Sequence, residues 1–165
     1  MKRKTASRQR FGKYQIYTLV LFLGVLAIDI ISKHIVFYNG IKRDFGFFAI
    51  NIVTNTGISF GLFQGNNTLF IIVSLAIFFA LVYFFKCFNR RERYFAALIG
   101  AGLVGNMLDR IIRGFVIDFI DFKFWPAFNA ADASIFIGVL GLIVLLVKSE
   151  IEKQKGPERQ FSSRI

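Results

Sequence analysis

Residues 68–85 read TLFIIVSLAIFFALVYFF, a run of eighteen positions without a charged side chain. A helix needs about 20 mostly apolar residues to cross the hydrocarbon core of a bilayer. The run is followed by the basic segment 86–93, which is typical of a span that leaves the membrane on its basic side. The sequence therefore predicts a transmembrane helix over residues 68–86.

Three further apolar runs predict spans at about residues 17–37, 94–110 and 132–148. The first follows a basic stretch, as in a secretory signal sequence. However, no small-residue cleavage pattern follows it, and its apolar character resumes after Lys33, so we expect an uncleaved span. Together the four runs predict one membrane-embedded domain over residues 1–165.

The third run is shorter than the others and rich in small residues. Ala97, Ala101 and Gly105 recur at four-residue spacing, a pattern that lets helix backbones approach closely inside lipid. We therefore expect the third helix to lie at the centre of the bundle.

Composition agrees with a membrane protein, because 55% of the 165 residues are hydrophobic and 22 are phenylalanine. The net charge of +11 could indicate nucleic-acid binding, but the basic residues gather at chain ends and one turn rather than along a helix face. With one cysteine, Cys87, and one histidine, His34, the chain can build neither an intrachain disulfide nor a multi-histidine metal site. We expect no nucleic-acid partner, no metal and no cofactor.

The distribution of charge predicts the orientation of the spans. Most of the 21 basic residues lie in residues 1–13, 86–93 and 148–165, and cytoplasmic loops carry such an excess. The tails 1–13 and 149–165 should therefore be cytoplasmic. All six aspartates fall in the opposite loops or at the adjoining ends of spans, so the acidic chemistry should face outward.

Two segments should lie on the outer side. Residues 38–67 contain a stretch rich in Phe, Ile, Val and Thr with intervening glycines, Phe45–Phe63, which predicts a small β-sheet on the membrane. Residues 109–132 mix charges with aromatic side chains that suit the headgroup layer, which predicts an interfacial loop. The fold class is thus all-α, with four transmembrane helices and a small extracytoplasmic sheet.

Ionisable residues near hydrocarbon are costly, so each one raises a functional hypothesis. Asp29 and Lys33 are four residues apart and could simply neutralise each other, with Lys33 extending toward the interface, and we favour this structural role. Asp109 and Arg110 could likewise cap the exit of the third helix and satisfy each other.

Asp118 and Asp132 are the strongest candidates for acid–base chemistry. Asp118 is flanked by large apolar residues, and burial raises the pKa of a carboxyl group. Asn129 could be the N-cap of the fourth helix with Asp132 at its third position, where the helix dipole favours the ionised form. Such a pair can share one proton, take another from a water that attacks an amide carbonyl, and return one to the leaving nitrogen.

Five short motifs in this order resemble the lipoprotein signal peptidase family, also called signal peptidase II or prolipoprotein signal peptidase, over nearly the whole chain. The matching pieces are Asp29 with Ser32-Lys33, Asn55-Thr-Gly57-Ile-Ser59-Phe60, Gly105-Asn106 with Asp109-Arg110, Val116-Ile-Asp118-Phe119, and Phe128-Asn129-Ala-Ala131-Asp132. The sequence departs from the usual pattern at Ile30, where glutamine is frequent, and at Ser59, where a small apolar residue is frequent.

The resemblance implies an aspartic endopeptidase of the bacterial cytoplasmic membrane. It would remove the signal peptide from prolipoproteins, cutting before a cysteine that carries diacylglycerol, with its site at the outer face. Asp118 and Asp132 would be the catalytic pair. The residues expected to shape the substrate pocket or support the pair are Asn55, Gly57, Asn106, Asp109, Arg110, Asn129, Asp29 and Lys33. Its partners would be lipidated prolipoproteins and membrane lipids, and we expect a monomer.

Other classes of protein explain the pattern less well. A small transporter or proton channel could use Asp29, Asp118 and Asp132 as a relay, but the second and fourth helices bring no ionisable residue to the middle of the membrane. A structural membrane subunit leaves the outward grouping of aspartates unexplained. A serine hydrolase pairing Ser59 with Lys33 rests only on a shared side of the membrane.

Overall fold

The computed structural model describes residues 2–57 and 64–162. Its helices are α1 (Lys2–Tyr38), α2 (Asn67–Phe84), α3 (Arg90–Arg113) and α4 (Ala130–Ser162), and its strands are β1 (Arg43–Asp44), β2 (Ala49–Asn55) and β3 (Val116–Asp121). Among the described residues, four helices contain a stretch long and apolar enough to cross a bilayer. The prediction of four transmembrane helices is confirmed.

Helices α1 and α4 are longer than their apolar runs. In α1 the apolar stretch is Tyr14–Tyr38, but the helix already begins at Lys2, and α4 continues beyond its apolar stretch to Ser162. The basic and acidic residues of both segments are good helix formers, and extending an existing helix avoids the cost of a new nucleus. The segments expected as tails therefore continue these helices, and their side of the membrane stays a prediction.

Helix α3 lies at the centre of the bundle and packs against α1, α2 and α4, as the small-residue spacing predicted. Its glycines explain the close approach. A Cβ atom added to Gly102 would come within 2.4 Å of the carbonyl oxygen of Ala131 in α4, and one added to Gly105 within 2.4 Å of Asp29 Oδ2 in α1. Only a residue without a side chain fits at these two crossings.

The remaining helix surfaces are apolar and face outward. Helix α2 buries none of its residues, and large side chains such as Leu23, Ile72 and Phe136 are about half exposed or more. An exposed apolar belt of this kind suits contact with lipid chains.

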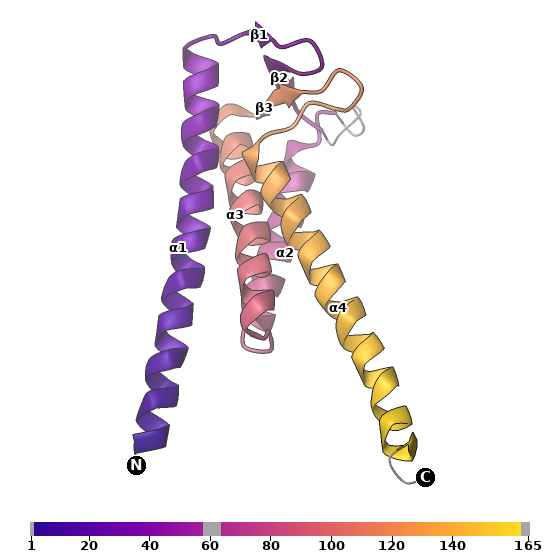
Figure 1. The fold of residues 1–165 in the computed structure, drawn as a ribbon. Coiled ribbons are helices and arrows are strands. Elements are labelled where there is room, and N and C mark those ends of the chain that lie inside the picture. Colours follow the sequence, from indigo (N-terminus) through magenta and orange to yellow (C-terminus); the bar gives the residue numbers. More distant parts are fainter. Residues whose placement is uncertain (1, 58–63, 163–165) are drawn as a thin grey trace.

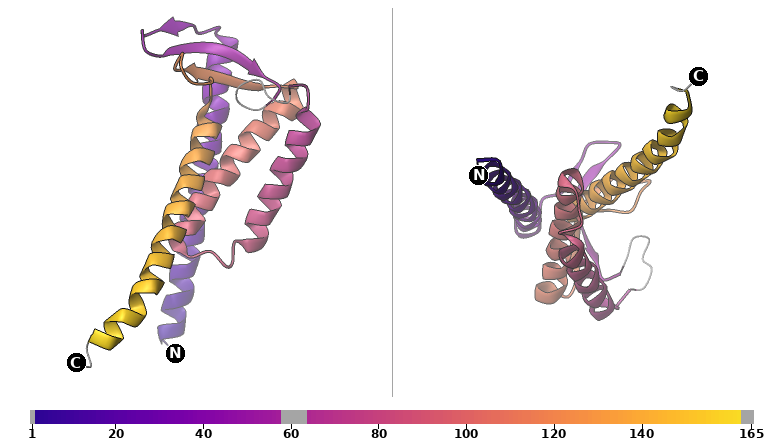
Figure 2. Two further views of the ribbon diagram at one scale, coloured as in Figure 1. Left: turned by 90° about the vertical axis from the view of Figure 1, so that its right-hand side faces the viewer. Right: turned by 90° about the horizontal axis from the view of Figure 1, so that it is seen from below.

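An antiparallel sheet in the order β1-β2-β3 lies across one end of the helices, at the opposite end from both termini (Figures 1 and 2). The predicted small sheet is therefore confirmed. Its strand β2 falls within the predicted stretch Phe45–Phe63, whereas residues 58–63 lie outside the described part of the chain. Within the predicted interfacial segment 109–132, residues 116–121 form strand β3, which the sequence did not predict and which pairs with β2.

The chain returns from β3 to α4 through a short hairpin. The backbone N–H of Ile120 donates to the carbonyl oxygen of Phe128 at 2.9 Å, and the N–H of Phe128 donates back at 3.0 Å. The rings of Phe122 and Phe128 stack with centroids 5.9 Å apart. This hairpin brings Phe128, two residues before α4, back beside Ile120 near the end of β3.

Candidate active site

Asp118 is held on the sheet by an asparagine of the neighbouring strand. It pairs with Val53 of β2, so Asn55, two residues further along β2, projects from the same face and lies diagonally from it. The Asn55 amide donates from Nδ2 to Asp118 Oδ2 at 2.9 Å, while its Oδ1 accepts the N–H of Gly57 at 2.9 Å. The turn at Gly57 thus orients the amide toward the carboxyl group.

Asp132 occupies the first turn of α4, where the predicted capping box is confirmed. Asn129 Oδ1 accepts the backbone N–H of Asp132 at 2.9 Å, and Asp132 Oδ2 accepts the backbone N–H of Asn129 at 3.2 Å. The reciprocal bonds satisfy two donors that a helix start leaves free. They also fix the side chain of Asp132 at the end of α4 nearest the sheet.

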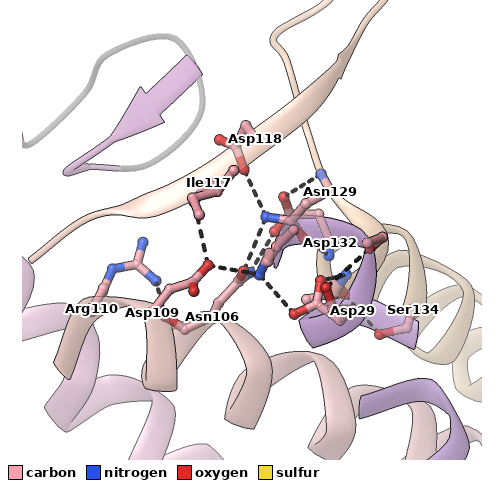
Figure 3. A network of polar contacts seen from close by, with 12 residues as sticks. Asp29, Asn106, Asp109, Arg110, Ile117, Asp118, Asn129, Asp132 and Ser134 are labelled. Carbon is pink, nitrogen blue, oxygen red and sulfur yellow. Dashed lines mark hydrogen bonds and ion pairs between the residues drawn. The ribbon is translucent and has the colours of Figure 1, made fainter. Parts of the chain in front are cut away.

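Two asparagines connect the aspartates (Figure 3). Asn129 Nδ2 donates to Asp118 Oδ1 at 2.7 Å, and Asn106 Nδ2 donates to Asp132 Oδ1 at 2.7 Å. Asn129 Nδ2 also reaches Asn106 Oδ1 at 3.1 Å, which joins the two halves. β3, α3 and the start of α4 therefore converge on one amide-bridged pair of carboxyl groups.

Below this pair lies a buried ion cluster, formed by Asp29, Lys33 and Asp109. Lys33 Nζ lies 2.7 Å from Asp29 Oδ2 and 3.0 Å from Asp109 Oδ2, and it donates to Asn106 Oδ1 at 2.9 Å. The predicted pairing of Asp29 with Lys33 is present. The expected extension of Lys33 toward the interface is wrong, because its side chain is only 1% exposed and three acceptors hold its ammonium group inside.

The two acids of this cluster also tie α1 to α4 and α3 to β3. Asp29 Oδ1 accepts the backbone N–H of Ala131 at the start of α4 at 2.8 Å, and Asp109 Oδ2 accepts that of Ile117 at 3.3 Å. The sequence predicted a pairing of Asp109 with Arg110, but in the structure the arginine paired with Asp109 is Arg113. Neighbouring residues of a helix do not face each other, whereas residues four apart do.

Arg110 instead reaches the turn after β2. Its Nη2 donates to the carbonyl oxygen of Gly57 at 3.0 Å, and its guanidinium lies over the ring of Phe70 with 5.2 Å to the centroid. Its buried Nε has no hydrogen-bond partner within the described residues. Arg110 therefore joins α3 to the turn after β2 and to α2.

A cavity of about 370 Å³ opens beside the carboxyl pair. Its wall combines apolar side chains of α2, such as Phe70 and Val73, with polar groups of the site. The polar lining comprises Asn55, Ser74, Asn106, Arg110, Asp118 and Asp132. A mostly apolar space of this volume with a few convergent polar groups has the character of a ligand site.

The pKa of Asp118 is raised to about 7. Burial is the largest cause and the nearby charge of Asp132 the second, and together they outweigh the amides of Asn55 and Asn129, which lower the pKa. A carboxyl group with such a pKa exchanges protons near neutral pH. No ion pair among the described residues involves either Asp118 or Asp132. The pair can therefore hold one shared proton beside the cavity, which is the requirement for acid–base activation of water.

The structure brings all the predicted site residues into one network, while other candidates lie elsewhere. His34 and Cys87 are exposed, on α1 and the α2–α3 turn, and Ser59 lies outside the described residues. Across residues 2–57 and 64–162, no three His, Cys, Asp or Glu side chains gather as metal ligands. Sequence reasoning missed Arg113, although its position four residues after Asp109 was a usable signal.

Comparisons with known proteins agree with this geometry. The family model described as Signal peptidase (SPase) II matches residues 21–148. The lipoprotein signal peptidase of Fusobacterium nucleatum is 40% identical over 152 residues, which cover 86% of this chain and 92% of that protein. That of Thermodesulfovibrio yellowstonii is 39% identical over 146 residues, covering 82% of this chain and 95% of that protein.

Solved structures support the same relationship. A bacterial membrane enzyme determined at 2.3 Å by the in meso method superimposes with a TM-score of 0.78 and 32% identity, covering 83% of this chain and 91% of that one. A second, determined at 1.9 Å, gives a TM-score of 0.72 and 33% identity, covering 80% and 93%. The chain is thus a multi-pass bacterial membrane protein of the lipoprotein signal peptidase family, aspartic peptidases that remove signal peptides from prolipoproteins.

Proposed function

We propose that Asp118 and Asp132 are the catalytic dyad of this peptidase, and that they activate a water molecule to cut before the lipid-modified cysteine. The observation that carries the proposal is the meeting of the two carboxyl groups at one cavity, linked by Asn106 and Asn129 and unpaired with any described cation. Two carboxyl groups in such a setting favour one shared proton over two charges.

The environments suggest a division of roles. Asp118, with its raised pKa, would hold the proton at rest, and Asp132, supported by the amide of Asn106 and the start of α4, would be ionised. Asp132 would take a proton from water as the water oxygen bonds to the scissile carbonyl carbon. Asp118 would protonate the carbonyl oxygen as this bond forms. As the C–N bond breaks, Asp132 would give its proton to the leaving nitrogen, and Asp118 would take one back from the diol, which restores the dyad.

Arg110 is suited to holding the peptide in the cavity. Its guanidinium is fixed by Gly57 and Phe70, and Arg110 is one of the residues that line the space. We propose that it donates to a backbone carbonyl of the substrate. A rigid donor of this kind orients the scissile bond without taking part in proton transfer.

The outer face of the membrane is the proposed location of the dyad. The sheet and the dyad lie at one end of the helices, and both termini lie at the other end beside the basic residues. The excess of Lys and Arg favours a cytoplasmic position for that second end. A reporter fused after residue 90 should then report a cytoplasmic location, and one inserted near Asn66 should report an external location. The reverse result would contradict the proposed orientation.

The direct test is cleavage by the purified protein. A precursor whose cysteine carries diacylglycerol should be cut immediately before that cysteine, in excess EDTA and after thiol blocking of Cys87. The same precursor without the lipid is the control, and it should react far more slowly because lipid anchoring supplies position and local concentration. Equal turnover of both precursors, or loss of activity to the chelator, would contradict the proposal.

A further inference from the structure

A second cavity, of about 360 Å³, lies near the end of the helices opposite the dyad, between α1, α2 and α3. Its wall is apolar apart from Gln15 and Thr18 of α1. The apolar lining includes Leu19, Phe22, Phe78, Val82, Ala97 and Gly100. Leu19 and Val82 are 57% and 55% exposed, so this groove reaches the lipid-facing surface.

The chemistry of the groove favours hydrocarbon as its occupant. A site with so few polar partners does not retain water. Its volume falls within the range of sites that hold organic ligands. The Thr18 hydroxyl is already used, because it donates to the carbonyl oxygen of Tyr14 at 2.8 Å. An acyl chain entering from the bilayer is the complementary ligand.

The end of the groove near the α2–α3 turn carries fixed positive charge. The guanidinium of Arg90 lies over the ring of Tyr14 at 3.3 Å, and Tyr14 directly precedes the lining residue Gln15. The guanidinium of Arg93 lies over the ring of Phe85, itself a lining residue, at 5.2 Å. Two guanidinium groups from the start of α3 are therefore held at the same end of an apolar groove.

Among the described residues, no acid forms an ion pair with Arg90. Lys86 and Arg91 are exposed there, and Glu92 is the only acid in residues 86–93. The carboxylate of Glu92 is engaged by the N-cap Asn89, whose backbone N–H donates to it at 2.7 Å. A guanidinium stacked on a ring still presents its N–H edge, which matches the oxygens of a phosphate.

We propose that this groove binds one anionic phospholipid, with an acyl chain along α1, α2 and α3 and the phosphate at Arg90. The inference rests on the transmembrane character of the helices and not on the dyad. An apolar groove alone accepts any lipid, whereas a basic rim selects a headgroup with net negative charge. Phosphatidylglycerol is the representative probe, and zwitterionic phosphatidylcholine is the neutral comparison.

The test is native mass spectrometry of the purified chain, incubated in neutral detergent with equimolar phosphatidylglycerol and phosphatidylcholine. The wild type should retain phosphatidylglycerol at least tenfold more than phosphatidylcholine. Arg90→Gln should reduce this preference to near unity. Arg91→Gln removes the same charge from an exposed side chain one residue away, and it should keep the preference.

The acyl-chain half of the site has its own pair of variants. A Cβ atom at Gly100 would lie 3.4 Å from the ring of Phe22 and 3.6 Å from that of Phe78, so Gly100→Leu fills the groove and should lower retention of both lipids at least tenfold. Gly24→Leu points into open space and should change nothing. If Gly100→Leu fails to fold by circular dichroism, Ala97→Leu in the same wall replaces it.

Four outcomes would overturn the proposal. Equal retention of both lipids by the wild type would remove headgroup selection. Equal loss in Arg90→Gln and Arg91→Gln would indicate diffuse charge instead of a site. Undiminished phosphatidylglycerol binding in folded Gly100→Leu and Ala97→Leu would place the acyl chain elsewhere. A dimer that survives lipid removal would identify a second copy of the chain as the occupant.

Discussion

Two groups of buried carboxylates lie at the same end of this molecule and differ in what holds them. In the buried ion cluster, Asp29 and Asp109 share the ammonium group of Lys33, and Arg113 also pairs with Asp109. In the dyad, Asp118 and Asp132 are held by the amides of asparagines and by the N-terminus of α4. The cluster is sealed inside the helices, whereas the dyad borders a cavity.

The difference supports a structural role for the ion cluster and the proposed chemical role for the dyad. A buried carboxylate paired with a buried cation holds that partner in place, because separating the two is costly. A carboxyl group held only by neutral amides can be either protonated or ionised, because amide donors orient it without supplying a full charge. The two regions meet at Asn106, which accepts from Lys33 and donates to Asp132. The cluster therefore fixes the geometry of the dyad without neutralising it.

The largest expected effect comes from removing either proton-exchanging group. Asp118→Asn and Asp132→Asn should each lower cleavage by several orders of magnitude, since an amide keeps the shape of the side chain but cannot exchange the proton. For Asp132, loss of the helix-start charge alone costs only about 0.3–1 kcal/mol of stability. Cleavage of a lipidated precursor, measured beside thermal unfolding, separates the two effects.

Asp121→Asn is the matched control for this comparison. Asp121 ends the same strand, three residues from Asp118, and is only partly buried. It should remain active if the dyad carries the chemistry. Equal losses in all three variants would instead indicate a general need for negative charge, and near-normal cleavage by Asp132→Asn would reduce that residue to a helix cap.

The next largest effect should come from breaking the ion cluster. Lys33→Met leaves Asp29 and Asp109 buried without their shared cation, and removing one partner of a buried ion pair costs about 3–5 kcal/mol. Denaturant unfolding in detergent should show the loss, and the remaining activity should fall with the folded fraction. Lys42→Met, on an exposed side chain of the α1–β1 turn, should have no measurable effect. Full stability of Lys33→Met would contradict the structural role.

A smaller effect should appear in the pH dependence of cleavage. With a pKa of about 7, the acid form of Asp118 is lost as pH rises through that value, so kcat/KM should fall about tenfold per unit above it. The amide of Asn55 stabilises the ionised form, so Asn55→Ala should raise the pKa and move this decline to higher pH. A shift to lower pH, or a flat profile up to pH 9, would exclude Asp118 as the acid.

The smallest effect is expected where charges pair at the surface. Lys123 Nζ lies 2.8 Å from both carboxylate oxygens of Asp44 and links the β3–α4 loop to β1, but both side chains are largely exposed. Exposed pairs contribute about 0.2–1 kcal/mol, so Lys123→Met should change unfolding by no more than that. A loss as large as that of Lys33→Met would show that burial is not the source of the difference.

The sequence predicted the parts that depend on local pattern. Four uninterrupted apolar runs marked the helices, the spacing from Asn129 to Asp132 marked the capping box, and the apolar flanks of Asp118 marked a buried acid. Each of these signals lies within a few neighbouring residues, where helix period and capping preferences operate.

The missing parts depend on contacts between distant segments. The sequence predicts an interfacial loop for the residues of β3 because charges mix with aromatic side chains there, and the partner strand β2 lies about sixty residues earlier. The sequence predicts a pairing of Asp109 with the adjacent Arg110, whereas one of the two cations that Asp109 contacts, Lys33, lies on another helix. Local pattern identifies a costly charge, but only the packing of α1 against α3 determines which cation offsets it.

The bond from Ala131 to Asp29 has a consequence for the order of synthesis. It joins the first helix to the last across 102 residues of sequence, at the turn that carries Asp132. A nascent chain that has inserted three helices can already unite Lys33 with Asp109, yet it lacks the amide donors of Asn129 and one of the two proposed catalytic carboxylates. Interrupted translation would therefore leave fragments that can insert but cannot cut, and proteolytic competence would begin only when the fourth helix enters the membrane.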